Sequence, residues 1–236
     1  PPKLIAVDLP TGLNADSGQV DPLTVMPNET VTFQYPKVGL YTQPGSAMAG
    51  EVQTVEIGIP SGIDEDMQIE LLERRDAKRL LPDREADTHK GSFGRVLVVA
   101  GSVQYPGAAV LAASAAYRVG AGLVALATPR SLIPALVSAM PEVVYVPLPD
   151  NASPGTPDPR SVDELKSVLG NYEAVVVGCG LGKAEATQEL IRDLVVSAEM
   201  AGRSGIVIDA DALNALTDAP PFREVVTPLV LTPHPG

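Results

Sequence analysis

Acidic residues directly follow apolar runs at two places in the sequence. In "VDLPTG" Asp8 ends one run, and the hydroxyl of Thr11 lies in the turn that follows. In "VIDADALNAL" Asp209 and Asp211 end another run, and Asn214 comes three residues later. Because burying an unpaired charge is costly, we expect these carboxylates at strand ends, facing a ligand. Such a carboxylate suits a general base, although an ordinary Pro-Thr-Gly turn capped by Asp8 explains the first motif equally well.

Glycine-rich turns follow two further apolar runs. Residues 100–110, "AGSVQYPGAAV", lead into a helix whose free N–H groups could bind an anion or an amide, but a plain loop is an equal alternative. Residues 178–183, "GCGLGK", match neither the dinucleotide-binding fingerprint nor the phosphate-binding lysine loop. For this second turn we favour close approach of the backbone to a ligand over a purely structural role.

His234 lies between two prolines in "TPHPG". Proline restricts the backbone, so this loop is stiff, and a core histidine rarely occupies such a loop. A ligand contact is therefore favoured over a packing role. The sequence contains only two histidines, and neither has a second metal-binding residue close to it in its motif, so a metal site with histidine ligands is not indicated.

The elements that would position these residues alternate from residue 93 onward. Strands are expected at residues 95–101, 123–129, 143–149, 173–182, 205–211 and 229–236. Helices are expected at residues 107–122, 131–140, 161–169, 186–200 and 212–216. This alternation is typical of a parallel sheet covered by helices on both faces. Ligands of such sheets bind beyond the carboxyl ends of the strands, where the motifs of this region lie.

Side-chain caps are expected for two of these helices. Ser161 and Glu164 form the pattern of a capping box. Asp211 directly precedes the segment 212–216 and is expected to cap its free N–H groups, which leaves Asp209 to face the ligand. The two neighbouring acids are thus predicted to have different roles.

The first part of the sequence has a different pattern. Residues 1–62 combine short strand-like runs with turns rich in Gly and Pro, and no helix of useful length fits there. Residues 63–84 predict a connector with one helix that Pro82 ends. A length of 236 residues is compatible with one or two domains.

The composition restricts the partners and the compartment. The net charge of −12 argues against a nucleic-acid partner, which needs a basic surface. Apolar residues make up 45% of the sequence, which is enough for a sizeable core, yet no run is long enough to span a membrane. Cys179 is the only cysteine, so no intrachain disulfide can form and a reducing cytoplasm is expected.

Taken together and in this order, the motifs resemble the bifunctional NAD(P)H-hydrate repair enzymes. Residues 1–62 carry "VDLPTGLNADSG", "PKVGL" and "GEVQTVEIGIP", which are similar to the epimerase part of that family. Residues 63–236 carry "HKGSFGRVLVVAGS", "VVVGCGLG", "VIDADALNAL" and "LTPHPG", which are similar to its dehydratase part. The resemblance implies an α/β fold: a partial ribokinase-like, layered α/β/α dehydratase domain, preceded by the C-terminal part of a Rossmann-like epimerase domain.

The resemblance also implies an activity. Its substrate is NAD(P)HX, the hydrated form of NADH or NADPH, whose R and S forms the epimerase interconverts with a bound potassium ion. The dehydratase then removes water from the S form, with the phosphate of ADP (or ATP) activating the hydroxyl that leaves. We further expect a homo-oligomer in the cytoplasm that binds neither nucleic acid nor membrane.

Functional residues can be carried over where this sequence matches the family. Asp8 matches the catalytic epimerase carboxylate that contacts the substrate. Thr11 stands where the family usually has a potassium-binding serine. Cys179 replaces the proline of the family's "GPGLG" pattern. The expected substrate contacts in the dehydratase part are Ala108, Gly180, Gly182, Asp209, Asn214 and His234.

The family's dehydratase also has a "GTGD" loop with the catalytic Asp, and its epimerase has an "NNGGDG"-like loop; neither occurs in this sequence. The sequence opens on a strand without an initiating Met and closes in a loop, so we expect an excerpt of a longer protein that is inactive by itself. Two alternatives stay open. One is another ribokinase-like kinase, such as one for a vitamin precursor alcohol, and the other is a nucleotide-binding module without catalysis.

Overall fold

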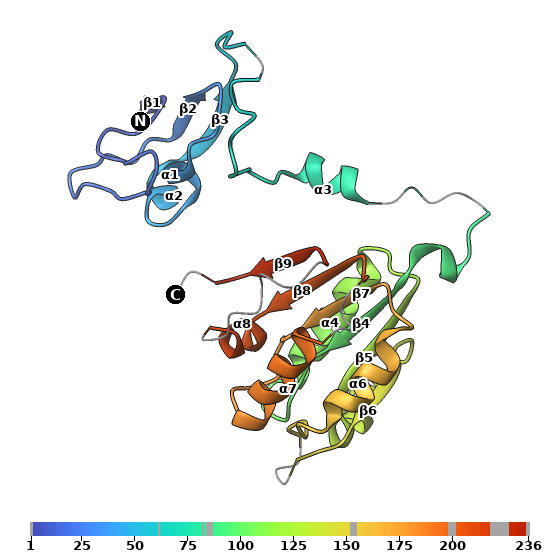
Figure 1. The fold of residues 1–236 in the computed structure, drawn as a ribbon. Coiled ribbons are helices and arrows are strands. Elements are labelled where there is room, and N and C mark those ends of the chain that lie inside the picture. Colours follow the sequence, from blue (N-terminus) through green and yellow to red (C-terminus); the bar gives the residue numbers. More distant parts are fainter. Residues whose placement is uncertain are drawn as a thin grey trace. The chain divides into compact units, whose positions relative to one another are not determined.

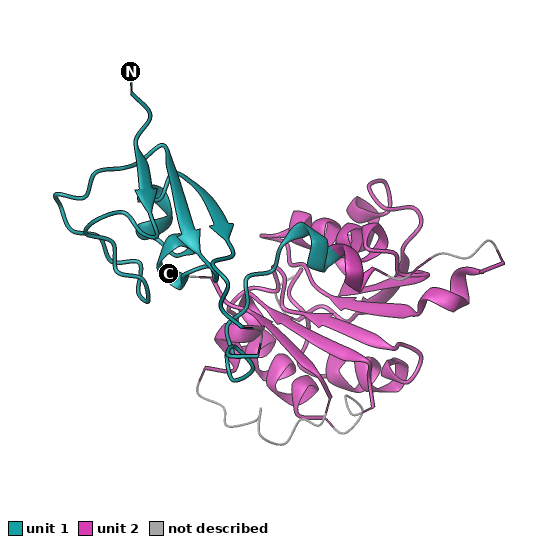
Figure 2. Cartoon of the chain, turned by 90° about the horizontal axis from the view of Figure 1, so that it is seen from above, with its two compact units in different colours: residues 1–77 teal, residues 78–236 magenta. Residues whose placement is uncertain are grey.

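The structure is a computed structural model that describes residues 2–60, 62–81, 83, 87–151, 155–197, 202–217 and 227–234. The chain forms two compact units, residues 1–77 and residues 78–236 (Figure 2). Each unit has a sheet of its own. The domain boundary predicted between residues 62 and 63 stays a prediction.

Unit 1, residues 1–77, is built on a three-stranded parallel sheet in the order β1-β2-β3. Its strands are β1 (Ile5–Val7), β2 (Glu29–Phe33) and β3 (Glu51–Val55). Its helices α1 (Val38–Tyr41) and α2 (Gly45–Met48) are one turn each, as expected for a segment without room for a longer helix. Leu13, Leu40 and Ala49 form its small buried core.

One further helix, α3 (Arg74–Leu80), lies between the two sheets in the sequence. It confirms the helix predicted within residues 63–84, although it covers only seven residues and buries none of them. Pro82, predicted to end this helix, lies outside the described residues.

Unit 2, residues 78–236, contains a six-stranded sheet in the order β6-β5-β4-β7-β8-β9. All neighbouring strands are parallel, which confirms the predicted fold class. The strands are β4 (Arg95–Val99), β5 (Leu123–Pro129), β6 (Val144–Leu148), β7 (Ala174–Val177), β8 (Gly205–Asp209) and β9 (Leu229–Thr232).

The helices of unit 2 follow the predicted order, with shorter bounds in several cases. They are η1 (Lys90–Phe93), α4 (Pro106–Arg118), η2 (Arg130–Leu132), α5 (Ile133–Leu136), α6 (Ser161–Leu169), α7 (Glu185–Val195) and α8 (Asp211–Ala215). Among the described residues, none of the helices combines the length and the hydropathy that crossing a bilayer requires.

Two hydrophobic cores cover the two faces of this sheet. Leu97 and Val99 of β4 pack with apolar residues of α6, α7 and α8. Val98, between them, faces the other side and packs with the alanines of α4. Side chains of a strand alternate between its faces, so this division produces the α/β/α layers that Figure 1 shows.

The capping box predicted at α6 is wrong. Ser161 is already the first helical residue, and the N-cap, Arg160, makes no side-chain cap hydrogen bond. The preceding loop decides this, because the Ser161 N–H donates to the carbonyl of Asp158 at 2.9 Å. The buried Ser161 hydroxyl donates to the Pro149 carbonyl, at 3.4 Å, instead of capping the helix.

The strand order changes direction between β4 and β7. From β4 the chain moves outward through β5 and β6, then crosses back to β7 and continues outward through β8 and β9. The helices that follow these two central strands, α4 and α7, therefore cover opposite faces (Figure 1). A ligand site is expected beyond the carboxyl ends of strands at such a switch point.

Candidate functional site

Two glycine-containing turns meet at the carboxyl ends of β4 and β7. The N–H of Gly101, after β4, donates to the carbonyl of Cys179, after β7, at 2.9 Å. The N–H of Gly178 donates to the carbonyl of Val99 at 3.2 Å. These bonds continue the pairing of the two strands past their ends, so the turns are held side by side at the switch point.

Gly180 brings the second turn against the start of α4. Its φ of +65° lies in the left-handed region that favours glycine. A Cβ at this position would lie 2.6 Å from the Cβ of Ala108 and 2.8 Å from that of Tyr105. The structure thus places two predicted site residues, Ala108 and Gly180, in direct proximity, and only glycine fits there without displacing its neighbours.

Gly182 also has a positive φ, +87°, but its surroundings are open. Apart from its sequence neighbours, the Ser102 Oγ is the only described atom within 4 Å of the position that a Cβ would take, at 3.9 Å. Ser102 is 4% exposed, and its hydroxyl has no hydrogen-bond partner among the described residues. A buried polar group without a partner is unusual, which makes this hydroxyl a candidate for a ligand contact. The motif "AGS" contained it, but sequence reasoning gave Ser102 no role.

The Asp209 carboxylate lies at the end of β8, as predicted. It accepts hydrogen bonds from the Thr232 hydroxyl, at 2.6 Å, and from the Cys179 thiol, at 3.2 Å. The next residue, Ala210, has φ +46° and ψ −115°, a conformation that costs an alanine energy. Strained residues of this kind often occur at functional sites, so Ala210 supports a site at this edge of the sheet.

The prediction that Asp211 caps α8 is wrong. Asp211 is the first residue of the helix, and the N-cap, Ala210, has no side chain that could act as a cap. The Asp211 carboxylate instead accepts the N–H of Gly182 at 2.8 Å. Asp209 and Asp211 therefore both contact the turn after β7, one through the Cys179 thiol and the other through the Gly182 backbone.

The environment of Cys179 suppresses thiolate chemistry. Burial raises the pKa of its thiol to about 12, and the hydrogen bond to the negatively charged Asp209 contributes to the same shift. The thiolate is the nucleophilic form of cysteine, so this residue is a weak nucleophile. Cys179 serves as a hydrogen-bond donor that orients the Asp209 carboxylate.

Asn214 and His234 are the remaining predicted site residues of unit 2, and both follow Asp211 in the sequence. Asn214 belongs to α8, and His234 follows β9 by two residues. Asn214 and His234 are both exposed. Their predicted contacts with the substrate stay predictions.

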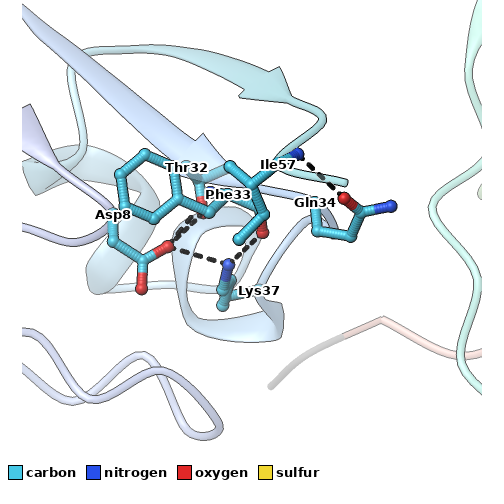
Figure 3. A network of polar contacts seen from close by, with 6 residues as sticks. All are labelled: Asp8, Thr32, Phe33, Gln34, Lys37 and Ile57. Atoms are coloured by element: carbon cyan, nitrogen blue, oxygen red, sulfur yellow. Dashed lines mark hydrogen bonds and ion pairs between the residues drawn. The ribbon is translucent and has the colours of Figure 1, made fainter. Parts of the chain in front are cut away.

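In unit 1, the predicted carboxylate Asp8 directly follows β1. Its backbone has φ +65°, a region that Asp tolerates better than most residues. Its Oδ1 accepts hydrogen bonds from the Thr32 hydroxyl at 3.2 Å, the Phe33 N–H at 3.1 Å and the Lys37 ammonium at 2.8 Å (Figure 3). The network therefore joins the carboxyl ends of β1 and β2.

Lys37 is the residue of this network that sequence reasoning missed, although it lies in the quoted motif "PKVGL". Its ammonium also donates to the Phe33 carbonyl, at 2.6 Å. The hydrogen bond from Lys37 is the main cause that lowers the pKa of Asp8, followed by the bond from the Phe33 N–H. Asp8 is thereby kept ionised near neutral pH and can accept a proton or a hydrogen bond.

Thr11 lies in an exposed turn three residues after Asp8. It offers one hydroxyl oxygen, whereas a potassium ion in a protein is surrounded by several oxygens. Among the described residues, no three His, Cys, Asp or Glu side chains are grouped so that they could hold a metal ion. Potassium is also bound by backbone carbonyl oxygens, so Thr11 stays a predicted ligand of a potassium ion.

The layered sheet and its strand order define unit 2 as a ribokinase-like α/β domain. Its fold is similar to a ribokinase-like superfamily protein of Enterococcus faecalis, with a TM-score of 0.57, 24% identity, and 69% of this chain and 53% of that chain covered. It is also similar to the ADP/ATP-dependent NAD(P)H-hydrate dehydratase of Bacillus subtilis, co-crystallised with ATP and Mg²⁺. That match has a TM-score of 0.53 and 31% identity, and it covers 72% of this chain and 55% of that chain.

The chain belongs to the NAD(P)H-hydrate dehydratase family, whose sequence model matches residues 96–236. Residues 1–39 match the N-terminus of YjeF-related proteins. The bifunctional NAD(P)H-hydrate repair enzyme Nnr of Moorella thermoacetica is 39% identical over 98% of this chain and 43% of that protein. The corresponding enzyme of Thermofilum pendens is 38% identical over 99% of this chain and 43% of that protein. The resemblance predicted from the motifs is confirmed, and the chain spans less than half the length of these relatives.

Proposed function

We propose that the protein carrying this chain repairs hydrated nicotinamide nucleotides. Unit 2 belongs to the part that dehydrates S-NAD(P)HX to NAD(P)H with ADP or ATP, and unit 1 to the part that interconverts the R and S hydrates. One observation carries the proposal. The relatives named bifunctional NAD(P)H-hydrate repair enzymes align with nearly the whole chain, across both units.

In unit 2 the substrate is proposed to lie beyond the ends of β4 and β7. Ala108, Gly180 and Gly182 would contact it through close backbone approach, for which the open space at Gly182 gives room. The unpartnered Ser102 hydroxyl offers one further hydrogen bond there. The remaining proposed contacts are Asp209, Asn214 and His234. A bound ADP or ATP would supply the phosphate that turns the hydroxyl into a better leaving group, and we assign no residue of this chain to the nucleotide.

In unit 1 the ionised Asp8 carboxylate is proposed to contact the hydroxyl of the hydrate and to act as the catalytic base of epimerisation. Its lowered pKa favours the ionised form, which can accept a hydrogen bond from that hydroxyl. Thr11 is proposed as one of several oxygen ligands of a potassium ion, and we derive no step through that ion.

The remaining proposals concern the setting of the protein. The single cysteine supports a reducing compartment, for which the cytoplasm is our proposal. The net charge of −12 supports small-molecule ligands rather than nucleic acid. A homo-oligomer stays a prediction.

The test of the dehydratase uses the protein in its full natural length and the His234→Ala variant. S-NADHX is supplied with and without ADP, and the absorbance of NADH is followed. Losing one hydrogen bond costs about 0.5–1.5 kcal/mol, so kcat/KM should fall about two- to tenfold while epimerisation is unchanged. The matched control is His89→Ala, because His89 caps η1 and has no proposed substrate contact.

Unchanged dehydration by His234→Ala would remove this histidine from the site. If the unmodified protein does not produce NADH from S-NADHX but phosphorylates a small alcohol with ATP, the kinase alternative is correct. Binding of nucleotide without either reaction would favour the non-catalytic module.

A further inference from the structure

Three donors converge on one oxygen of the Asp8 carboxylate. Thr32, Phe33 and Lys37 all donate to Oδ1 (Figure 3). Among the described residues, none donates a hydrogen bond to Oδ2. A carboxylate has about four acceptor positions on its two oxygens, so Asp8 is held through one oxygen and presents the other. Its side chain is 40% exposed, which leaves Oδ2 accessible to a ligand.

The Lys37 ammonium is held in a similar way. It has three N–H groups, and two are used by the Asp8 Oδ1 and the Phe33 carbonyl. Within the described part of the chain, the third has no acceptor, and 24% of the Lys37 side chain is exposed. The pair therefore offers an open acceptor and an open donor next to each other, which matches a hydroxyl group because a hydroxyl both donates and accepts.

We propose that Lys37 is a positioning residue of the epimerase site, which fixes the Asp8 carboxylate so that Oδ2 binds the hydroxyl of the hydrated nicotinamide ring. The third ammonium N–H donates to the oxygen of the same hydroxyl. This inference rests on the function proposed for unit 1, and it adds to that site a residue to which no role was assigned from the sequence.

The local energetics favour this role over a purely structural ion pair. Exposed ion pairs add little to stability, and unit 1 contains such a pair, Lys3–Glu29, at 2.6 Å with Lys3 63% exposed. In the Lys37–Asp8 pair the lysine is only 24% exposed, two further donors bind the same carboxylate, and the backbone of Asp8 is in the left-handed region. Lys37 is also the charged side chain that lowers the pKa of Asp8, so its removal should raise that pKa.

The test uses the protein in its full natural length with Lys37→Met, Lys37→Arg and the matched control Lys3→Met. Epimerisation of R-NADHX is measured from pH 4 to pH 8. For Lys37→Met we expect kcat/KM at neutral pH to fall about 10- to 100-fold, the range for losing a hydrogen bond to a charged group. The acid limb of the pH profile should move to higher pH, because the loss of the Lys37 ammonium raises the pKa of Asp8. Lys37→Arg should restore part of the rate, and Lys3→Met should change neither quantity.

A second measurement does not depend on catalysis. The Asp8 carboxyl is titrated by ¹³C NMR in protein labelled at aspartate, and its signal is identified by its loss in Asp8→Asn. A higher Asp8 pKa in Lys37→Met supports the positioning role even if the unmodified protein does not epimerise, in which case the proposed function alone fails. An acid limb and an Asp8 pKa that both stay unchanged in Lys37→Met would overturn the inference.

Discussion

The Asp211 carboxylate accepts a hydrogen bond from the backbone N–H of Gly182, a residue 29 positions earlier, at 2.8 Å. This bond ties the start of α8 to the glycine turn after β7. It also keeps the N–H of Gly182 occupied in a turn whose other side is open towards Ser102. The shape of the proposed substrate site therefore depends on an acid that belongs to the next strand–helix unit.

Asp211→Ala is expected to loosen this turn. Leaving a backbone N–H without its partner costs about 1–3 kcal/mol, so exchange of the Gly182 amide with deuterium should accelerate about 10- to 100-fold. Asp211→Asn keeps an acceptor oxygen and should accelerate exchange less. The measurement is hydrogen exchange by mass spectrometry on a peptide spanning residues 178–183, with exposed Asp193→Ala as the control. Equal exchange in Asp211→Ala and Asp193→Ala would show that the bond does not hold the turn.

Two alanine substitutions distinguish the tightly packed position of Gly180 from the open position of Gly182. Gly180→Ala places a Cβ within 3 Å of two neighbouring Cβ atoms, and overpacking of this kind costs about 1–3 kcal/mol. Gly182→Ala meets open space and adds only the strain of its positive φ, about 1 kcal/mol. Gly180→Ala should therefore lower Tm more, by several degrees, whereas Gly182→Ala should mainly weaken binding of S-NADHX. Equal Tm values for the two variants would contradict the packing described for Gly180.

Cys179 is expected to resist alkylation in the folded protein. Its pKa of about 12 leaves little thiolate at pH 8, so iodoacetamide should react much more slowly than after unfolding in urea. Asp209→Asn removes a negative charge beside the thiol, which should lower the pKa and accelerate the reaction. Because folding favours the protonated thiol, this group stabilises the fold below pH 9, and that contribution is lost as the pH rises towards 12. A slower reaction in Asp209→Asn would contradict the contact.

Ser102→Ala is expected to spare the fold. The buried Ser102 hydroxyl has no partner among the described residues, so its removal should leave Tm unchanged or slightly raised. Ser131→Ala is the comparison, because the Ser131 hydroxyl donates to Asp150 at 2.6 Å and its loss should lower Tm. If Ser102 faces the substrate, Ser102→Ala should also weaken S-NADHX binding, measured by calorimetry. A large fall in Tm for Ser102→Ala would mean that the hydroxyl supports the fold.

The local pattern of the sequence by itself determined the order of strands and helices along the chain. It also determined the edge of the sheet at which a ligand site is expected. Apolar runs alternating with amphipathic segments predicted all six strands of unit 2, because burial of both sheet faces imposes that alternation. The same reasoning placed Asp8 directly after β1 and Asp209 at the end of β8. Strand ends carry polar residues that the interior would not accept, and this contrast is visible without a structure.

Tertiary structure alone decided which groups meet. Asp211 could satisfy the N–H groups of its own helix or that of Gly182, and only the pairing of β7 with β8 brings Gly182 within reach. The lysine that orients Asp8 lies 29 residues away, and the parallel pairing of β1 with β2 brings the two strand ends together. Propensity and periodicity act over one or two turns of chain, whereas these contacts depend on the register of strands distant in sequence.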